Sequence, residues 1–164
     1  MFQLKYANDE DVPLIHKLAK QVFPETYKHI LSPEQNEFMF EWMYSEENIR
    51  RQLLEGHHYF LCLDNTKPCG YVSVQQIEKD LFHLHKIYVL PQYQGTGAGR
   101  YLFEQALQYI KSIHPEPCRM ELHVNRNNPA VNFYKKLGMS VVRSGDFDIG
   151  HGYFMNDYIM GIDI

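Results

Sequence analysis

The sequence is short of cysteine, of basic residues and of long apolar runs, and each shortage excludes a class of protein. Its 164 residues include only Cys62, Cys69 and Cys118, too few and too scattered for a disulfide framework or a Cys-x-x-Cys metal site. No apolar run approaches the roughly 20 residues that a membrane-spanning helix needs, and the first residues lack a secretory-signal pattern. We therefore expect a cytoplasmic protein with reduced thiols and no membrane partner.

The balance of charge argues against a nucleic-acid partner. The chain carries 16 Lys and Arg against 20 Asp and Glu, a formal net charge of −4, whereas nucleic-acid-binding domains present a basic surface. An acidic protein attracts cationic substrates, although a charge this small adds little. The adjacent His57 and His58 lack a spaced third ligand, so no metal site is expected.

The pattern of apolar residues predicts one mixed α/β domain over residues 1–164. Hydrophobic residues make up 45% of the chain, which is ordinary for a folded domain. Period-two alternation predicts strands over residues 2–6, 58–63, 70–77, 81–90, 120–124, 140–142 and 153–160. Helical spacing predicts helices after Asn8, Ser32 and Ser45, another that ends near residue 113, and a short one over 129–137. The first helix should end before Pro24.

A glycine-rich turn between a strand and a helix is the most informative segment. Gly95, Gly97 and Gly99 alternate within Gln94–Arg100, just after the strand that contains Val89. Glycine lets the backbone turn tightly and approach a ligand closely. The free N–H groups at the start of the next helix favour an anion. The segment therefore predicts a site for a phosphate group.

Two other phosphate-binding motifs do not fit this turn. A Walker A loop needs Lys-Ser/Thr after its glycines, and none follows here. The dinucleotide motif Gly-x-Gly-x-x-Gly fails in both registers, because its last position falls on Arg100 or Leu102. A purely structural turn is the remaining alternative, but each glycine within a regular element costs about 0.5–1 kcal/mol. We retain phosphate binding as the interpretation.

The same turn resembles a motif of the GNAT superfamily of N-acetyltransferases. The run Gln94-Gly95-Thr96-Gly97-Ala98-Gly99 is similar to the family's Gln/Arg-x-x-Gly-x-Gly/Ala motif, which also follows a strand ending in Val-x-Pro. A second family segment resembles residues 122–139, with matches at Leu122, His123, Val124, Asn127, Ala130, Phe133, Tyr134, Leu137 and Gly138, and with Met139 replacing the usual aromatic residue. Residues 22–27 and 152–160 resemble a bacterial branch that includes spermidine/spermine acetyltransferases.

The resemblance implies a fold and a co-substrate. It implies a mixed, mostly antiparallel central sheet flanked by helices, with splayed strands where acetyl-CoA binds. In the family, the amides of the glycine turn hold the pyrophosphate, and a backbone N–H of Ile87 or Val89 would polarise the thioester carbonyl here. The implied coenzyme contacts are Ile87, Tyr88, Val89, Gln94, Gly95, Thr96, Gly97, Ala98, Gly99, Arg100, Asn127 and Tyr134.

Two of these residues have an alternative role. Tyr134 corresponds to the family tyrosine that protonates the departing thiolate, which would make it a catalytic acid. Spacing alone favours a core aromatic residue, because it shares one apolar helical stripe with Ala130, Phe133 and Leu137. Asn127 corresponds to the family asparagine that bonds the pantetheine region. An asparagine before proline is also a normal helix cap, and Asn128 is the other residue for that role.

The reaction also needs a general base, since an alkyl amine with a pKa near 10 is protonated at neutral pH. Histidine titrates in a suitable range. Strict alternation along the strand places two sets on opposite faces: His83, His85, Ile87 and Val89, and Leu84, Lys86, Tyr88 and Leu90. We expect His85 to be the base, because the family often keeps an acidic or polar residue at that place. The alternatives are a packed or solvated His85 and a base among His57, His58 and His151.

The acceptor pocket is expected after the first helix and on the closing strand. The predicted contacts are Glu25, Tyr27, Tyr153 and Phe154, with Glu25 anchoring a cationic amine. All four are also explained as ordinary surface or core residues.

The predicted activity is acetyl-CoA-dependent transfer of an acetyl group to a primary amine of a small molecule by direct attack on the thioester. Polyamines are among the acceptors that the resemblance suggests. Two alternatives stay open: a non-catalytic acyl-CoA-binding sensor or interaction module, and a protein N-terminal or lysine acetyltransferase. Many family members dimerise, so a homodimer is also considered.

Overall fold

One sheet of seven strands forms the centre of the molecule. The structure is a computed structural model and describes residues 1–164. The strands lie in the order β1-β2-β3-β4-β5-β7-β6, and every neighbouring pair is antiparallel except β4 and β5. Their bounds are β1 Phe2–Tyr6, β2 His58–Asp64, β3 Lys67–Glu78, β4 Leu81–Val89, β5 Arg119–Asn125, β6 Ser140–Gly150 and β7 Tyr153–Asp163. The predicted mixed, mostly antiparallel sheet is confirmed.

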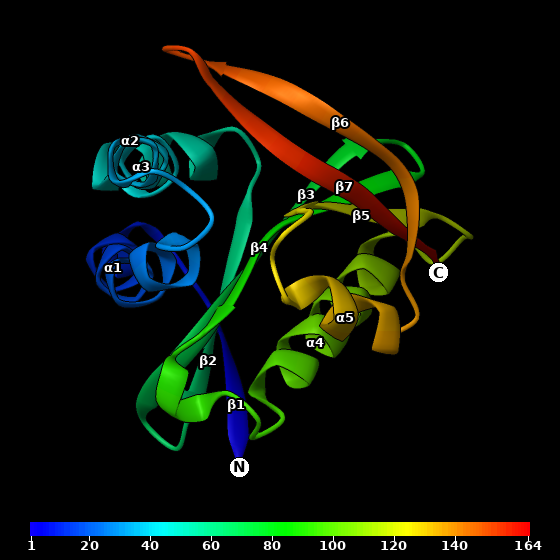
Figure 1. Ribbon diagram of the computed structural model, residues 1–164. Helices are drawn as coiled ribbons and strands as arrows, with labels where there is room; N and C mark the ends of the chain where they lie inside the picture. Colours follow the sequence, from blue (N-terminus) through cyan, green and yellow to red (C-terminus); the bar gives the residue numbers. More distant parts are fainter.

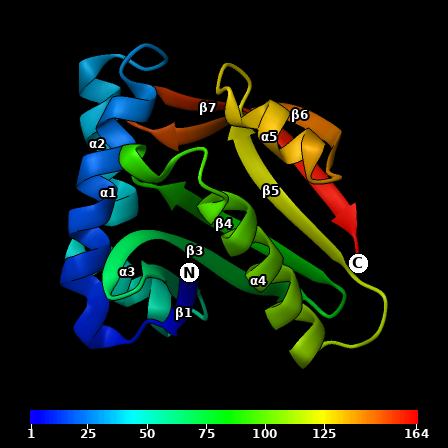
Figure 2. The same cartoon turned by 90° about the horizontal axis from the view of Figure 1, so that it is seen from below.

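Helices cover both faces of this sheet. Helices α1 to α3 lie on one face, and α4 and α5 lie on the other (Figures 1 and 2). Each face has its own buried apolar cluster, so the sheet is covered on both sides. The bounds are α1 Val12–Tyr27, α2 Pro33–Tyr44, α3 Glu46–Leu54, α4 Ala98–Ile113 and α5 Ala130–Lys136. No helix has the length and apolar character needed to cross a membrane.

Side-chain caps begin α2 and α3 where the sequence predicts them. Ser32 Oγ accepts a hydrogen bond from Gln35 N at 3.1 Å, and Ser45 Oγ accepts one from Asn48 N at 3.2 Å. Each bond satisfies an N–H group that has no partner within its own helix. The two predicted helix starts are confirmed.

The predicted end of α1 before Pro24 is wrong, because the helix continues to Tyr27. Proline removes one helical hydrogen bond. Phe23 and Tyr27, on either side of it, are buried in the core on this face. Their burial, worth about 1.5–3 kcal/mol for a fully buried large apolar side chain, outweighs that lost bond.

Strand β6 is much longer than the predicted segment 140–142. It pairs with β7 from Ser140 to Gly150, and the connecting turn holds Gly150 and Gly152 at positive φ. Polar residues such as Asp146 and Asp148 hid this strand from the apolar pattern. We call the hairpin of residues 140–163 the arm, and its tip extends towards α2 (Figure 1).

A β-bulge at His85 changes which residues of β4 share a face. Opposite β3, Lys86 pairs with Ser73 and Leu84 with Val74, so His85 is the extra residue. The predicted alternation is therefore wrong across the bulge. One face carries Leu84, Ile87 and Val89, which pack with the α4 core; the other carries Lys86, over the Tyr44 ring, and Tyr88 and Leu90 of the α1–α3 core.

Strands β4 and β5 diverge and leave a gap in the sheet. They pair only from Leu81 to His83 on β4, and their far ends separate in Figure 2. Leu90 N donates to Cys69 O of β3 at 2.9 Å. Since hydrogen bonding alternates along an antiparallel pair, the backbone of Ile87 and Val89 faces the gap. The splayed strands expected from the resemblance are confirmed.

Candidate active site

Two pockets meet at the gap between β4 and β5. The first, about 640 Å³, is lined by the glycine turn, β4, β5 and α5, and we call it the glycine-turn pocket. The second, about 720 Å³, lies among α2, α3 and the arm, and we call it the arm pocket. Seven residues line both: Tyr27, Leu84, His85, Lys86, Tyr88, Leu122 and His123. The two spaces therefore share walls at the gap.

The glycine turn aims free backbone N–H groups at the first pocket. Gly95 and Gly97 have φ of 80° and 93°, which only glycine adopts readily. Gly97 is the residue before α4, and its carbonyl accepts from Tyr101 N at 2.9 Å. The N–H groups of residues 98–100 consequently have no acceptor within the helix. A side chain at Gly99 would come within 3.1 Å of the Phe133 ring.

The charges of the glycine-turn pocket suit an anion. No Asp or Glu lines it, although the chain has 20 acidic residues. Arg100 on α4 and Lys136 on α5 both line it. The turn, the helix dipole and these two cations fit a pyrophosphate group. Lys136 was missed from the sequence because a lysine near a helix C-terminus is unremarkable.

Most of the predicted coenzyme residues line this pocket. Its lining includes Ile87, Tyr88, Val89, Gln94, Gly95, Gly97, Gly99, Arg100 and Tyr134. Thr96 and Ala98 do not line it: the Thr96 hydroxyl donates to Tyr93 O, and Ala98 is buried in the α4 core. Ala98 still presents its N–H at the helix start. The unpaired edge at Ile87 and Val89 fits an extended ligand with amide groups.

The structure brings Asn128, not Asn127, to this pocket. Asn127 is exposed, and its N–H donates to Asn125 Oδ1 at 2.9 Å. Asn128 Oδ1 accepts a hydrogen bond at 2.9 Å from the N–H of Ala130, the first residue of α5, and its Nδ2 lies 3.4 Å from Tyr27 OH. The Asn-Asn pair was ambiguous in sequence because only the turn geometry decides which side chain points inward.

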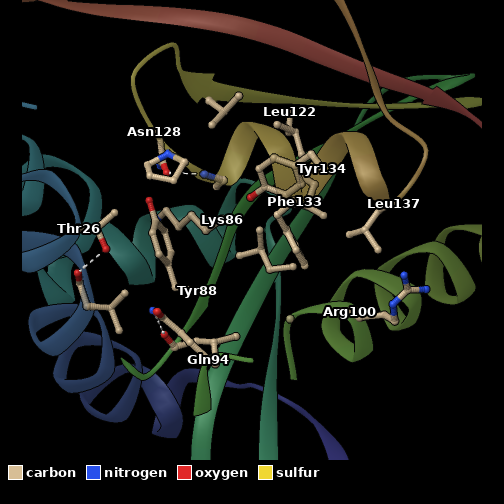
Figure 3. A pocket seen from close by; sticks show the side chains of 18 of the residues that line it. Thr26, Lys86, Tyr88, Gln94, Arg100, Leu122, Asn128, Phe133, Tyr134 and Leu137 are labelled. Carbon is tan, nitrogen blue, oxygen red and sulfur yellow. Dashed lines mark hydrogen bonds between the residues drawn. The ribbon is translucent and has the colours of Figure 1, made fainter. Parts of the chain in front are cut away.

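Tyr134 projects from α5 towards the gap (Figure 3). The residue is 7% exposed and lines the glycine-turn pocket. Burial, with the nearby Tyr27, raises the pKa of the Tyr134 hydroxyl above its usual range. The hydroxyl therefore keeps its proton at neutral pH and is able to donate it.

The His85 ring stacks on one neighbouring imidazole, and the bulge removes His85 from the strand face that it was predicted to share with Ile87. Its Nε2 is 2.8 Å from Gln75 Oε1, and its ring stacks on His57 at 4.3 Å. Gln75 Nε2 donates to Glu55 O, which leaves its oxygen to accept from His85. Burial, followed by the nearby His57 and other cationic or imidazole groups, lowers the pKa of His85 to about 3. The ring is neutral, and protonating it is costly.

Lys86 is a buried cation that the sequence did not single out. It is 4% exposed, and its Nζ donates to Met43 O at 2.8 Å and Gln52 Oε1 at 2.9 Å. It also donates to Tyr59 OH and lies 4.2 Å from the centre of the Tyr44 ring. Burial lowers the pKa of Lys86 well below its usual value. These bonds tie α2 and α3 to the sheet beneath the arm pocket.

Of the four predicted acceptor contacts, Tyr27 and Phe154 line the arm pocket. Glu25 lies outside both pockets, with its side chain 63% exposed and paired with Lys28. Tyr153 also lies outside them and packs on Phe38, with ring centres 5.2 Å apart. The structure therefore does not place Glu25 where an amine would bind.

A carboxylate absent from the sequence prediction does line the arm pocket. Asp157 on β7 is 2% exposed, and its Oδ2 has no hydrogen-bond partner. His123 Nδ1, on β5, lies 3.7 Å from that oxygen. His123 belongs to the walls of both pockets. No group of three or more His, Cys, Asp or Glu side chains is arranged to hold a metal ion.

The fold and the first pocket together define an acyl-CoA-binding protein of the acetyltransferase class. The sequence pattern of the Acetyltransferase (GNAT) family matches residues 14–139. The chain belongs to this family of acyltransferases, and acetyl-CoA is its co-substrate.

Several known proteins are similar to the chain. An uncharacterised N-acetyltransferase of Methanocaldococcus jannaschii is 34% identical over 86 residues, 49% of this chain and 38% of that protein. The peptidyl-lysine N-acetyltransferase YjaB of Escherichia coli is 32% identical over 110 residues, 66% of this chain and 67% of YjaB. The spermidine N(1)-acetyltransferase of Thermoplasma acidophilum is 22% identical over 85% of this chain and 88% of its own.

The solved structures agree on the fold. PaiA N-acetyltransferase of Thermoplasma acidophilum, in complex with coenzyme A, superposes with a TM-score of 0.82 at 22% identity, covering 100% of this chain and 99% of that one. The chain spans less than half the length of the Methanocaldococcus relative. The relatives differ in the amine that their names give, which is peptidyl lysine for YjaB and spermidine for the Thermoplasma enzyme.

Proposed function

We propose that the protein transfers the acetyl group of acetyl-CoA to a primary amine of a small molecule that enters through the arm pocket. The observation that carries the proposal is the shared wall of seven residues where the two pockets meet. A coenzyme in one pocket and an amine in the other would reach each other there. Bringing two reactants together in this way supplies much of the rate enhancement of a transfer reaction.

The glycine-turn pocket holds the coenzyme. Acetyl-CoA supplies the acetyl thioester. The free amides of residues 98–100, with Arg100 and Lys136, bind its phosphates. The N–H of Ile87 or Val89, both facing the gap, stabilises negative charge that develops on the carbonyl oxygen during attack.

Tyr134 acts as the acid. Its buried hydroxyl keeps its proton and points towards the gap (Figure 3). It donates that proton to the leaving sulfur, which leaves the pocket as a thiol.

His123 acts as the base in place of His85. A base with a pKa of about 3 accepts a proton from an ammonium group poorly. His123 stands at the gap, and the Asp157 carboxylate 3.7 Å away stabilises the imidazolium that forms. The proton of the incoming ammonium passes to His123, the neutral amine attacks the carbonyl carbon, and the C–S bond then breaks. The second proton that the nitrogen loses on becoming an amide restores the Tyr134 hydroxyl.

Two alternatives have partial support. The first is protein acetylation, which YjaB supports as a peptidyl-lysine enzyme by name; the spermidine enzyme instead supports a polyamine as the small-molecule acceptor. A coenzyme-binding sensor without turnover would keep the glycine turn but would not need Tyr134 or a second pocket joined to the first. A homodimer stays a prediction.

Thiol release from acetyl-CoA by purified protein tests the proposal across amines, diamines, polyamines and peptides. Release that depends on an amine supports it. Tight coenzyme binding without release for any acceptor would contradict it and favour the sensor. His123→Ala should lower kcat/KM about 100-fold, as removal of a general base does; His85→Ala should have a smaller effect, and the reverse order would restore His85 as the base.

A further inference from the structure

We propose that the acceptor is a small monoamine with an apolar body, held at its ammonium group by Asp157 and along its chain by the walls of the arm pocket. This inference rests on the proposed function, because it names the acceptor of that transfer. It is carried by the burial of one carboxylate, by the charges around it and by the apolar lining of the pocket.

Asp157 needs a positive partner that the protein does not supply by a hydrogen bond. The residue is 2% exposed, and its Oδ2 is buried without a hydrogen-bond partner. A buried charge without a partner is costly. His123 Nδ1 at 3.7 Å is beyond hydrogen-bonding distance. An ammonium group entering the pocket would pair with Asp157 and lie beside His123, where its proton must go.

The charges of the arm pocket match one ammonium group and not several. Glu55 is the other carboxylate in its lining, and it pairs with Arg51 at 3.6 Å. With Glu55 paired to Arg51, Asp157 is the one lining carboxylate left for an ammonium group, so the further charges of a polyamine would find no partner in this pocket. A spermidine-like chain would therefore bind with one charge paired and the others unpaired.

The remaining walls are apolar. Helix α2 contributes Met39, Trp42 and Met43, and the arm contributes Phe147, Phe154 and Met155. Among the 23 lining residues, 13 are hydrophobic. Burying an apolar chain between these walls is favourable because it removes apolar surface from water. An aromatic or branched aliphatic body fits them better than a chain of protonated nitrogens.

The tip of the arm contacts α2 next to the pocket, and the size of the pocket favours a small molecule over a polypeptide. Gln35 Nε2 on α2 donates to Phe154 O on the arm at 2.9 Å. The Phe38 ring packs on His151 and Tyr153, with centres 4.8 and 5.2 Å away. The pocket volume of about 720 Å³ is within the range of small-molecule sites.

The first test compares acceptors with the unaltered protein. Thiol release is measured with 2-phenylethylamine, tryptamine and isoamylamine against spermidine, spermine and lysine-containing or free-N-terminus peptides. The kcat/KM of the monoamines should exceed that of spermidine by about 10-fold or more, because each unpaired charge of spermidine should weaken its binding by at least that factor. A preference for a polyamine or peptide would overturn the inference and leave acetyl transfer standing. If none of the acceptors caused thiol release, that result would instead contradict the proposed function.

The second test measures binding, so it does not depend on turnover. Calorimetry with coenzyme A-saturated protein compares 2-phenylethylamine with 2-phenylethanol, which has the same body and no charge. The amine should bind about 10-fold tighter than the alcohol, and Asp157→Asn should remove that difference. Glu25→Gln, the same chemical change outside both pockets, should leave it unchanged. Equal binding of amine and alcohol to the unaltered protein overturns the inference even if Asp157→Asn does not fold.

Discussion

The hydroxyl oxygens of Tyr27 and Tyr88 lie 3.1 Å apart, which joins the end of α1 to β4 at the place where the two pockets meet. Both side chains line both pockets. Asn128 Nδ2 lies 3.4 Å from the same Tyr27 oxygen. These contacts link the end of α1, strand β4 and the residue Asn128 just before α5. Movement of α1 would alter both pockets together.

The left-handed backbone at Gly97 should be needed for coenzyme binding. An added Cβ at Gly97 would touch nothing within 4 Å, and the same holds at Gly56, where φ is +96°. Gly97→Ala and Gly56→Ala should each cost about 1–2 kcal/mol of unfolding free energy through backbone strain alone. Only Gly97→Ala should weaken coenzyme A binding, by about 10-fold. Urea unfolding and calorimetry measure the two effects, and unchanged affinity in Gly97→Ala would mean that the turn is not the phosphate site.

Removing the Tyr134 hydroxyl should slow turnover without loss of the coenzyme. Tyr134→Phe keeps the buried ring and should lower kcat about 100-fold. Affinity for coenzyme A should stay nearly the same, because the phosphate contacts are elsewhere. Tyr101→Phe is the control, since Tyr101 packs on Phe2 outside both pockets. A kcat of Tyr134→Phe equal to that of the unaltered enzyme at every pH would exclude Tyr134 as the acid.

The two neighbouring asparagines should behave differently. Asn128→Ala removes the hydrogen bond to the first N–H of α5 and should cost about 1 kcal/mol of stability, and it should raise the KM for acetyl-CoA because Asn128 lines that pocket. Asn127→Ala changes an exposed side chain and should leave stability and KM nearly unaltered. Thermal unfolding and initial rates for both variants decide the assignment. A larger KM effect for Asn127→Ala would restore the role predicted from the family motif.

Stability should fall as the pH drops below the ordinary pKa of histidine. Burial is the main cause that lowers the pKa of His57 to about 4 and of His85 to about 3. The unfolded chain therefore binds more protons than the folded one between about pH 6.5 and 4, and folding loses free energy in that window. Between pH 7 and 5 the two rings should remove about 2 kcal/mol, allowing for their partial exposure.

Urea unfolding at pH 7, 6 and 5 measures this loss. Replacing both residues in the variant His57→Gln/His85→Gln should flatten the pH dependence. The exposed His29→Gln should leave it in place. An equally steep loss in the double variant would mean that other groups control acid stability.

The residues of the sequence by themselves predicted the mixed α/β class and an anion-binding glycine turn, and the family resemblance implied the co-substrate. The first two predictions depend on local chemistry: alternation along strands, caps such as Ser32 and Ser45, and glycines whose positive φ no other residue adopts easily. Such signals need no knowledge of distant residues. The family motif then supplied Tyr134, which spacing alone treated as a core residue.

Only the tertiary structure suggested the acceptor side proposed above. The bulge at His85 depends on pairing with β3, and one extra residue moved the side chains after it to the opposite face. Asp157 and His123 come from β7 and β5 and meet only because those strands pair. Glu25 looked suitable in the sequence, yet the helix turns it to solvent. A site built by long-range pairing leaves no local pattern, so its residues appear only when the sheet is assembled.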